Sequence, residues 1–152
     1  MKLTSNLSVA EVTKSATAIR RGIGNMPSAT HLIALKAVAE HIFQPCRNYF
    51  GKPLAITSGY RSEELNDLIG GSKTSQHSKG EALDLDADVY GGFSNAELFY
   101  YIKKNLDFDQ LIWEFGNSNN PSWVHCSYKT RGNRNEVLIA IKTKGITTYT
   151  KL

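Results

Sequence analysis

The segment 82–87, Ala-Leu-Asp-Leu-Asp-Ala, constrains the fold most strongly, because its apolar and acidic side chains alternate. This period of two predicts a strand with its leucines in the core and its aspartates on the other face. His77 precedes the strand, and Gly80 lies between them. Because glycine has no Cβ to obstruct a positive φ, the chain can turn at Gly80 and bring His77 towards Asp84. One nitrogen and one oxygen ligand suit a zinc ion, but a catalytic zinc needs a third protein ligand and an open position.

The third ligand has few candidates, because the chain contains only four histidines. His31 and His41 lie in one predicted helix, too far apart along its axis to bind a single metal, and we expect both at the surface. His125 lies in a short segment rich in β-forming residues. A polar loop joins this segment to the strand pattern of residues 110–115, so Glu114 can lie beside His125.

The residues alone leave other interpretations open. Asp84 fits a solvent-facing strand position equally well, and Asp86 or Asp88 would replace it as a ligand in a different strand register. Glu114 fits the role of a structural cross-strand partner. A calcium scaffold built from the three aspartates lacks the spacing of a known loop such as the EF-hand, so we do not expect one.

Several sequence blocks occur in a characteristic order. They are Ile56-Thr57-Ser58-Gly59-Tyr60-Arg61-Ser62 with Gly70-Gly71-Ser72, then Ser75-x-His77-x-x-Gly80-x-Ala82-x-Asp84, then Glu114, then Trp123-Val124-His125-x-Ser127. Together they resemble the D-alanyl-D-alanine carboxypeptidase family of zinc peptidases, over roughly residues 45–145. That family includes bacterial carboxypeptidases and dipeptidases and phage L-alanyl-D-glutamate endopeptidases. Residues 15–27 resemble the leader of a small subgroup found in phages and prophages.

The resemblance implies a metal centre with a general base. His77, Asp84 and His125 would bind Zn²⁺ and leave a fourth position for water. Glu114 would take a proton from that water and later give it to the leaving amine.

The resemblance also implies two residues that contact the substrate. Arg61, which on residue type alone fits a surface arginine equally well, would bind a substrate carboxylate or support a developing oxyanion. Ser75 would hydrogen-bond the substrate or orient the site, although a simple loop serine fits nearly as well.

Composition describes an ordinary soluble globular chain. A length of 152 residues predicts one domain spanning residues 1–152, and 41% hydrophobic with 21% charged residues is typical of such domains. The net charge of +4 comes from scattered basic residues, with one loose group at Lys129, Arg131 and Arg134. This charge would aid approach to an anionic polymer such as a cell wall, although a solvated surface explains it more simply. No basic stretch is interleaved with aromatics, so we expect no nucleic-acid partner.

The two cysteines do not form a disulfide framework. Cys126 is adjacent to His125 in a predicted strand, so the two side chains point to opposite faces. We therefore expect a buried thiol at Cys126 rather than a ligand or nucleophile, and packing at Cys46.

Periodicity and capping signals predict the elements. One helix is expected from Ser8 to Gly22, and another from about Ala29 until Pro45, which would kink or end it. Ser62 and Ser94 are predicted to cap two further helices. Strands are expected at residues 54–57, 82–87, 110–115, 123–128 and 137–141, with an edge piece at 146–149.

Helices packed on one side of a mostly antiparallel sheet make an α+β domain, with the zinc site on the open sheet face. The resembled family has a fold of that kind. In the strand at 110–115, alternation places Phe115 with Leu111 and Trp113, on the face opposite Glu114.

We therefore expect a zinc metallopeptidase that hydrolyses peptidoglycan stem-peptide bonds, either as an endolysin-like endopeptidase or as a D-Ala-D-Ala carboxypeptidase. The alternative is a non-catalytic, zinc-stabilised domain that binds cell wall or forms part of a virion, and the presence of Glu114 argues against it. The sequence shows no secretory signal and no apolar membrane span. We expect a monomer without stable membrane association, made in the cytoplasm and released to the cell wall through a holin-type pore.

Overall fold

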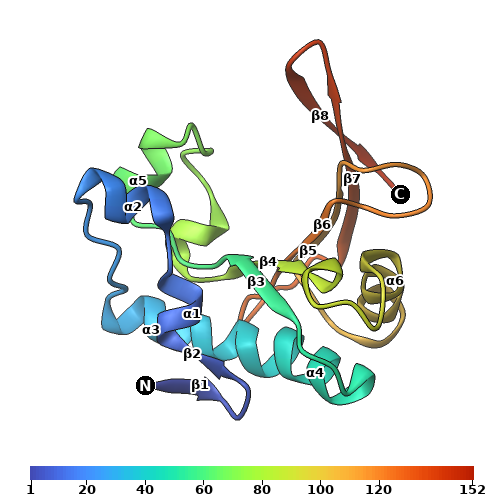
Figure 1. Ribbon diagram of the computed structural model, residues 1–152, viewed down its shortest axis with the longest axis horizontal. Helices are drawn as coiled ribbons and strands as arrows, with labels where there is room; N and C mark the ends of the chain where they lie inside the picture. Colours follow the sequence, from blue (N-terminus) through green and yellow to red (C-terminus); the bar gives the residue numbers. More distant parts are fainter.

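The fold centres on a six-stranded sheet in the order β3-β4-β6-β5-β7-β8 (Figure 1), in a computed structural model that describes residues 1–152. Neighbouring strands pair antiparallel except β5 and β7, which are parallel. The strands are β3 (Ala55–Ser58), β4 (Ala82–Asp86), β5 (Gln110–Glu114), β6 (Trp123–Ser127), β7 (Glu136–Thr143) and β8 (Ile146–Lys151). A separate two-stranded sheet joins β1 (Lys2–Thr4) and β2 (Leu7–Ser8).

Most of the helices bury one face of the main sheet, which confirms the predicted α+β class. The helices are α1 (Val9–Thr13), α2 (Ala16–Arg21), α3 (Ala29–Val38), a π-helical turn η1 (Ala39–Phe43), α4 (Gln44–Phe50), α5 (Glu63–Leu68) and α6 (Asn95–Asn105), with short 3₁₀ turns η2 (Gln76–Lys79) and η3 (Ala87–Val89). Side chains of α3, η1, α4 and α6 form one continuous core with the covered sheet face. None of the helices is both long and apolar enough to cross a membrane.

Strand alternation assigns the two faces of the sheet as predicted. Leu83 and Leu85 on β4 are fully buried in the core beneath the helices, and Cys126 on β6 lies there too. The opposite face carries a small apolar cluster, Ile112, Leu138 and Ala140. Because side chains alternate along each strand, this cluster shares its face with Asp84 and His125, and that face is the open one.

The predicted helix from Ser8 to Gly22 is wrong as a single element. Ser8 begins α1 with the predicted capping box, but Lys14 is extended (ψ 127°) and ends it. The hydroxyl of Ser15 then accepts a hydrogen bond from the Ala18 N–H and starts α2. A second capping residue therefore breaks the apolar stripe, and Ile19, expected on that stripe, is 75% exposed.

Pro45 does not end the second helix, contrary to one of the two predicted outcomes. The chain passes through η1, where the Gln44 N–H bonds to the Ala39 carbonyl, five residues back, and continues as α4 to Phe50. The wider π turn accommodates the missing N–H and the bulky ring, so the chain stays helical. Gly51, in the left-handed region at φ 62°, ends the helix instead.

Candidate metal centre

The 3₁₀ turn η2 carries His77 to the open face of the sheet. The hydroxyl of Ser75 caps this turn by accepting a hydrogen bond from the His77 N–H, 3.3 Å away. Gly80 ends the turn at φ 73°, where a Cβ would also lie 2.6 Å from the His31 carbonyl oxygen. The expectation that Gly80 permits the turn before β4 is therefore confirmed, and close packing on α3 adds a second reason for glycine.

A backbone carbonyl fixes the ring of His77. Its Nδ1 lies 2.7 Å from the Gly59 oxygen in a buried hydrogen bond, so Nδ1 carries the proton and donates it. In the neutral ring this leaves the lone pair of Nε2 facing Asp84, which is the tautomer that a metal ligand needs, whereas in the protonated ring Nε2 donates to Asp84. Gly59 reaches this position because it packs directly on α1, where a Cβ would collide with the backbone oxygen of Val12.

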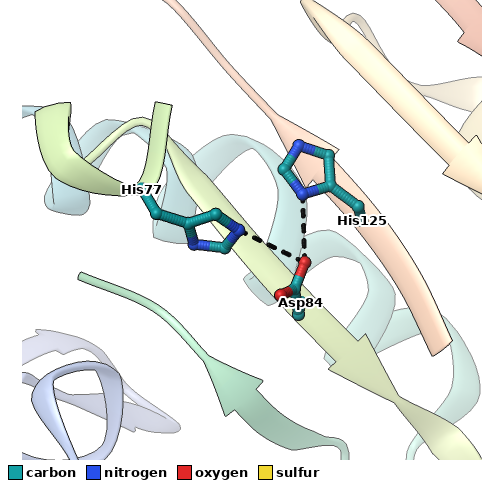
Figure 2. A group of neighbouring side chains, drawn as sticks. All are labelled: His77, Asp84 and His125. Atoms are coloured by element: carbon teal, nitrogen blue, oxygen red, sulfur yellow. Dashed lines mark hydrogen bonds and ion pairs between the residues drawn. The ribbon is translucent and has the colours of Figure 1, made fainter. Parts of the chain in front are cut away.

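Asp84 and His125 meet because their strands are in register. The β4–β6 ladder places them directly opposite one another, and His125 Nδ1 lies 3.0 Å from Asp84 Oδ1. His77 Nε2 lies 3.3 Å from the same oxygen (Figure 2). One donor atom from each of the three residues lies within 4.8 Å of the others.

The two neighbouring histidines, rather than burial, determine the ionisation state of the Asp84 carboxyl. Burial would raise the pKa of this carboxyl, but the charges of His77 and His125 and their hydrogen bonds outweigh it. The pKa of Asp84 therefore lies well below its ordinary range, and the carboxylate is ionised at neutral pH.

The donor set fits zinc. Two imidazole nitrogens and one carboxylate oxygen, converging from a turn and two strands, form the three-ligand set of a catalytic zinc site. The other candidates have different partners: Asp86 accepts a hydrogen bond from Asn95, and Asp88 accepts from Asn95 and Asn120. The structure thus brings together the predicted set and not the alternatives based on Asp86 or Asp88.

Glu114 lies on the same face as the donor set, one strand further along the sheet. Its pair across β5–β6 is Trp123, and the next same-face pair along the two strands joins Ile112 to His125. Glu114 is only 7% exposed. Burial raises its pKa to about 7, with the His125 charge opposing and the Asp84 charge adding to the rise.

Arg61 and Ser75 line one wall of the cleft above the donor set. The backbone N–H of Arg61 donates to the His77 carbonyl at 3.2 Å, which ties the arginine to the η2 turn. Its side-chain Nε is buried and has no hydrogen-bond partner in the protein. Burial lowers the pKa of Arg61, although the nearby charge of Asp84 acts in the opposite direction.

The cleft has a volume of about 890 Å³ and runs across the open sheet face. Ile112 and Leu138 contribute to its lining from β5 and β7. Two residues of the predicted loose basic group, Lys129 and Arg134, also line it.

Asp109 holds Lys129 and Arg134 at this end of the cleft, a role that was not predicted from the sequence. Its side chain has no exposed surface and accepts hydrogen bonds from Arg134 Nη2 at 2.7 Å, Arg134 Nε at 3.0 Å and Gln76 Nε2 at 3.0 Å. Lys129 Nζ lies 3.7 Å away. Burial would raise the pKa of Asp109, but the hydrogen bonds and charges of Arg134 and Lys129 lower it. Asp109 therefore connects the turn that carries His77 to the segment before β7.

Phe115 faces the cleft together with Glu114, so its predicted placement on the opposite face of the strand is wrong. Its backbone lies in the left-handed region at φ 56°, which ends the strand alternation just after Glu114. The ring packs against Trp123 at a centroid distance of 5.3 Å, and both rings line the cleft. Tyr149 on β8 lines it as well and was also missed. No local sequence signal marks these positions, because tertiary context sets both.

Comparison with protein families gives one match. A family model described as Peptidase M15 matches residues 5–127, which include the three donors, Glu114 and Arg61. No curated protein matches the chain. The matched range ends at the last residue of β6, so β7 and β8 lie outside it.

Proposed function

The chain belongs to the peptidase M15 family, whose members are zinc-dependent peptidases related to D-Ala-D-Ala carboxypeptidases, and from this premise we propose that it hydrolyses peptide bonds in bacterial cell-wall stem peptides. One observation carries the proposal: a metal-binding donor set and a buried carboxylate with a raised pKa share the floor of one open cleft.

In this proposal His77, Asp84 and His125 hold the zinc ion. When bound, zinc supplies Lewis acidity, which polarises a carbonyl oxygen and makes water a better nucleophile at neutral pH. The hydrogen bond from His77 Nδ1 to the Gly59 carbonyl supports this role, because it holds the ring in the ligand tautomer before any metal arrives.

Glu114 is the proposed general base and acid. A carboxylate with a pKa of about 7 can accept a proton from the attacking water and give it to the departing amine at the same pH. Its low exposure keeps bulk water from competing for the proton.

Arg61 and Ser75 are the proposed substrate contacts. Arg61 lines the cleft beside the donor set, where its guanidinium can meet a substrate carboxylate or oxygen charge that develops during the reaction. The Ser75 hydroxyl already accepts from the His77 N–H, so its own proton can be donated to a peptide carbonyl.

The proposed substrate class follows from the charge and shape of the cleft. Its lining carries four cations, Arg61, Lys79, Lys129 and Arg134, against the two anions Asp84 and Glu114. Stem peptides carry several carboxylates, which such a lining attracts. We favour an endopeptidase over a carboxypeptidase, because the cleft extends past the donor set towards β8 and leaves room for substrate on both sides. We propose that the protein acts on its substrate at the cell wall.

Digestion of purified peptidoglycan by the zinc-loaded protein, followed by mass spectrometry, tests the proposal. Newly exposed D-glutamyl amines would identify an L-alanyl-D-glutamate endopeptidase, and free D-alanine would identify a carboxypeptidase. Glu114→Gln should bind zinc normally and lose about 10²–10⁴-fold in turnover. A folded, zinc-loaded wild-type protein that releases no fragment would refute the proposal and favour a binding domain.

A further inference from the structure

Strand register places Tyr149 in the same row of side chains as Glu114. Trp123 pairs with Glu114, Glu114 with Ala140, and Ala140 with Tyr149, across the strands β6, β5, β7 and β8. Directly paired residues in a sheet present their side chains on the same face. The row therefore crosses the open face, from a strand that carries a metal donor to the edge strand of the sheet.

The small side chain of Ala140 gives Tyr149 access to the cleft. Two strand spacings separate Tyr149 from Glu114, about 10 Å between their backbones. Because only a methyl group lies between them, the long tyrosine side chain can extend over β7, and Tyr149 lines the cleft together with Glu114. Desolvation, followed by the negative charges of Glu114 and Asp84, raises the pKa of Tyr149, in agreement with a phenol that faces this site.

Tyr149 and Arg61 belong to opposite ends of the cleft. Arg61 follows β3, at one edge of the sheet, and Tyr149 lies on β8, at the other edge. The donors Asp84 and His125 lie on β4 and β6, between these two ends. An extended substrate that contacts Arg61 and crosses the donor set continues over Glu114 towards Tyr149.

We propose that the β7–β8 hairpin is the specificity wall of the cleft and that Tyr149 binds the arm of the substrate that lies beyond the scissile bond from Arg61. This inference rests on the proposed peptide-hydrolase function and deepens it. Tyr149 is 56% exposed, so its ring and hydroxyl are available to a ligand. A tyrosine at such a position offers a rigid apolar face for a side chain and a hydroxyl for a peptide carbonyl, at a low entropy cost.

The hairpin lies outside the residues that the family model matches, so the match assigns no role to this wall. Figure 1 shows the hairpin projecting beyond the rest of the sheet, with its turn at Lys144 and Gly145 far from the helices. The base of the hairpin, where Ala140 and Tyr149 pair, is the part beside the cleft.

The test compares ligands that reach Tyr149 with ligands that do not. The probes are the stem pentapeptide L-Ala-D-γ-Glu-L-Lys-D-Ala-D-Ala and the dipeptides L-Ala-D-Glu and D-Ala-D-Ala. Calorimetric titration into zinc-loaded Glu114→Gln measures binding without turnover, with Tyr149→Phe and Tyr149→Ala added to that background. Tyr90→Phe serves as a matched control, because Tyr90 is similarly exposed at 64% and does not line the cleft.

Tyr149→Phe should weaken pentapeptide binding roughly two- to tenfold, the range for one neutral hydrogen bond, and Tyr149→Ala should weaken it further. In the otherwise wild-type enzyme the same changes should raise KM for the pentapeptide with kcat nearly unchanged. Binding of the dipeptides should not change. Equal pentapeptide affinity in Tyr149→Ala and its parent, or equal losses for all three ligands, would overturn the inference. A wild-type enzyme that cleaves none of the peptides would instead refute the proposed function, and the binding comparison would still decide the role of Tyr149.

Discussion

Replacing Asp109 with asparagine should cost this protein much of its stability, although Asp109 lies outside the metal centre. The carboxylate is fully buried and accepts three hydrogen bonds from the side chains of Arg134 and Gln76. Breaking a buried ion pair by removing one partner typically costs 3–5 kcal/mol. Because the Arg134 side chain is 50% exposed and can regain water, we expect the lower end, about 3 kcal/mol. For a chain of this length that corresponds to a fall in Tm of roughly 6–12 °C.

Urea unfolding of the wild type and Asp109→Asn measures the difference, and the pair Asp67–Lys73 supplies the control. Their charged atoms are 2.9 Å apart, close to the 2.7 Å of the Asp109 pair, but both side chains are largely exposed. Asp67→Asn should therefore cost less than about 1 kcal/mol. Equal losses in the two variants would refute the argument that burial decides the effect.

The same carboxylate gives stability a defined pH dependence. The pKa of Asp109 is lower in the folded protein than its ordinary value, so its contribution is complete above the unfolded pKa and is lost as the pH falls through the folded pKa. The difference in unfolding free energy between wild type and Asp109→Asn should therefore be constant near neutral pH and shrink below about pH 4. A difference that grows in acid would contradict the assigned direction.

Three further predictions concern the metal centre and the core. Zinc at a hundredfold excess over its Kd should raise the free energy of unfolding by about 2.7 kcal/mol, and His77→Ala should abolish this gain in a calorimetric melt. Gly59→Ala should lower zinc affinity about 10–100-fold by displacing the carbonyl that orients His77, whereas Gly24→Ala, with open space around its Cβ, should leave titrated affinity unchanged. Burial raises the pKa of the Cys46 and Cys126 thiols, so a colorimetric thiol reagent should detect neither in the native protein and both after unfolding; rapid native labelling would contradict their placement.

Local sequence patterns, such as strand alternation and helix caps, predicted the features that depend on interactions between residues close together in the chain. Alternation around Asp84 assigned the buried and open faces of β4 correctly, because a side-chain period of two follows from strand geometry alone. Capping residues located the starts of α1, α5 and α6 for a similar reason, since each cap bonds to a backbone group three residues away. The donor set could be predicted because its members lie in ordered motifs, and strand register then brings Asp84 and His125 together.

Features that depend on distant segments could not be predicted. Asp109 acquires its role only when Gln76 and Arg134, each far away in sequence, converge on it. Phe115 leaves the strand alternation because its backbone takes a positive φ, which its residue type disfavours. Tyr149 enters the cleft through pairings that cross four strands, and no short window of sequence encodes that register.

The position of β8 at the edge of the sheet has a consequence for how the protein behaves in concentrated solution. β8 pairs only with β7, so its outer side presents backbone donors and acceptors that a strand from another copy would satisfy. The hairpin carries the exposed lysines Lys142, Lys144 and Lys151, and like charges oppose edge-to-edge pairing of two copies. This protection against aggregation is electrostatic, so it is strong in dilute buffer and weakens as salt shortens the screening length.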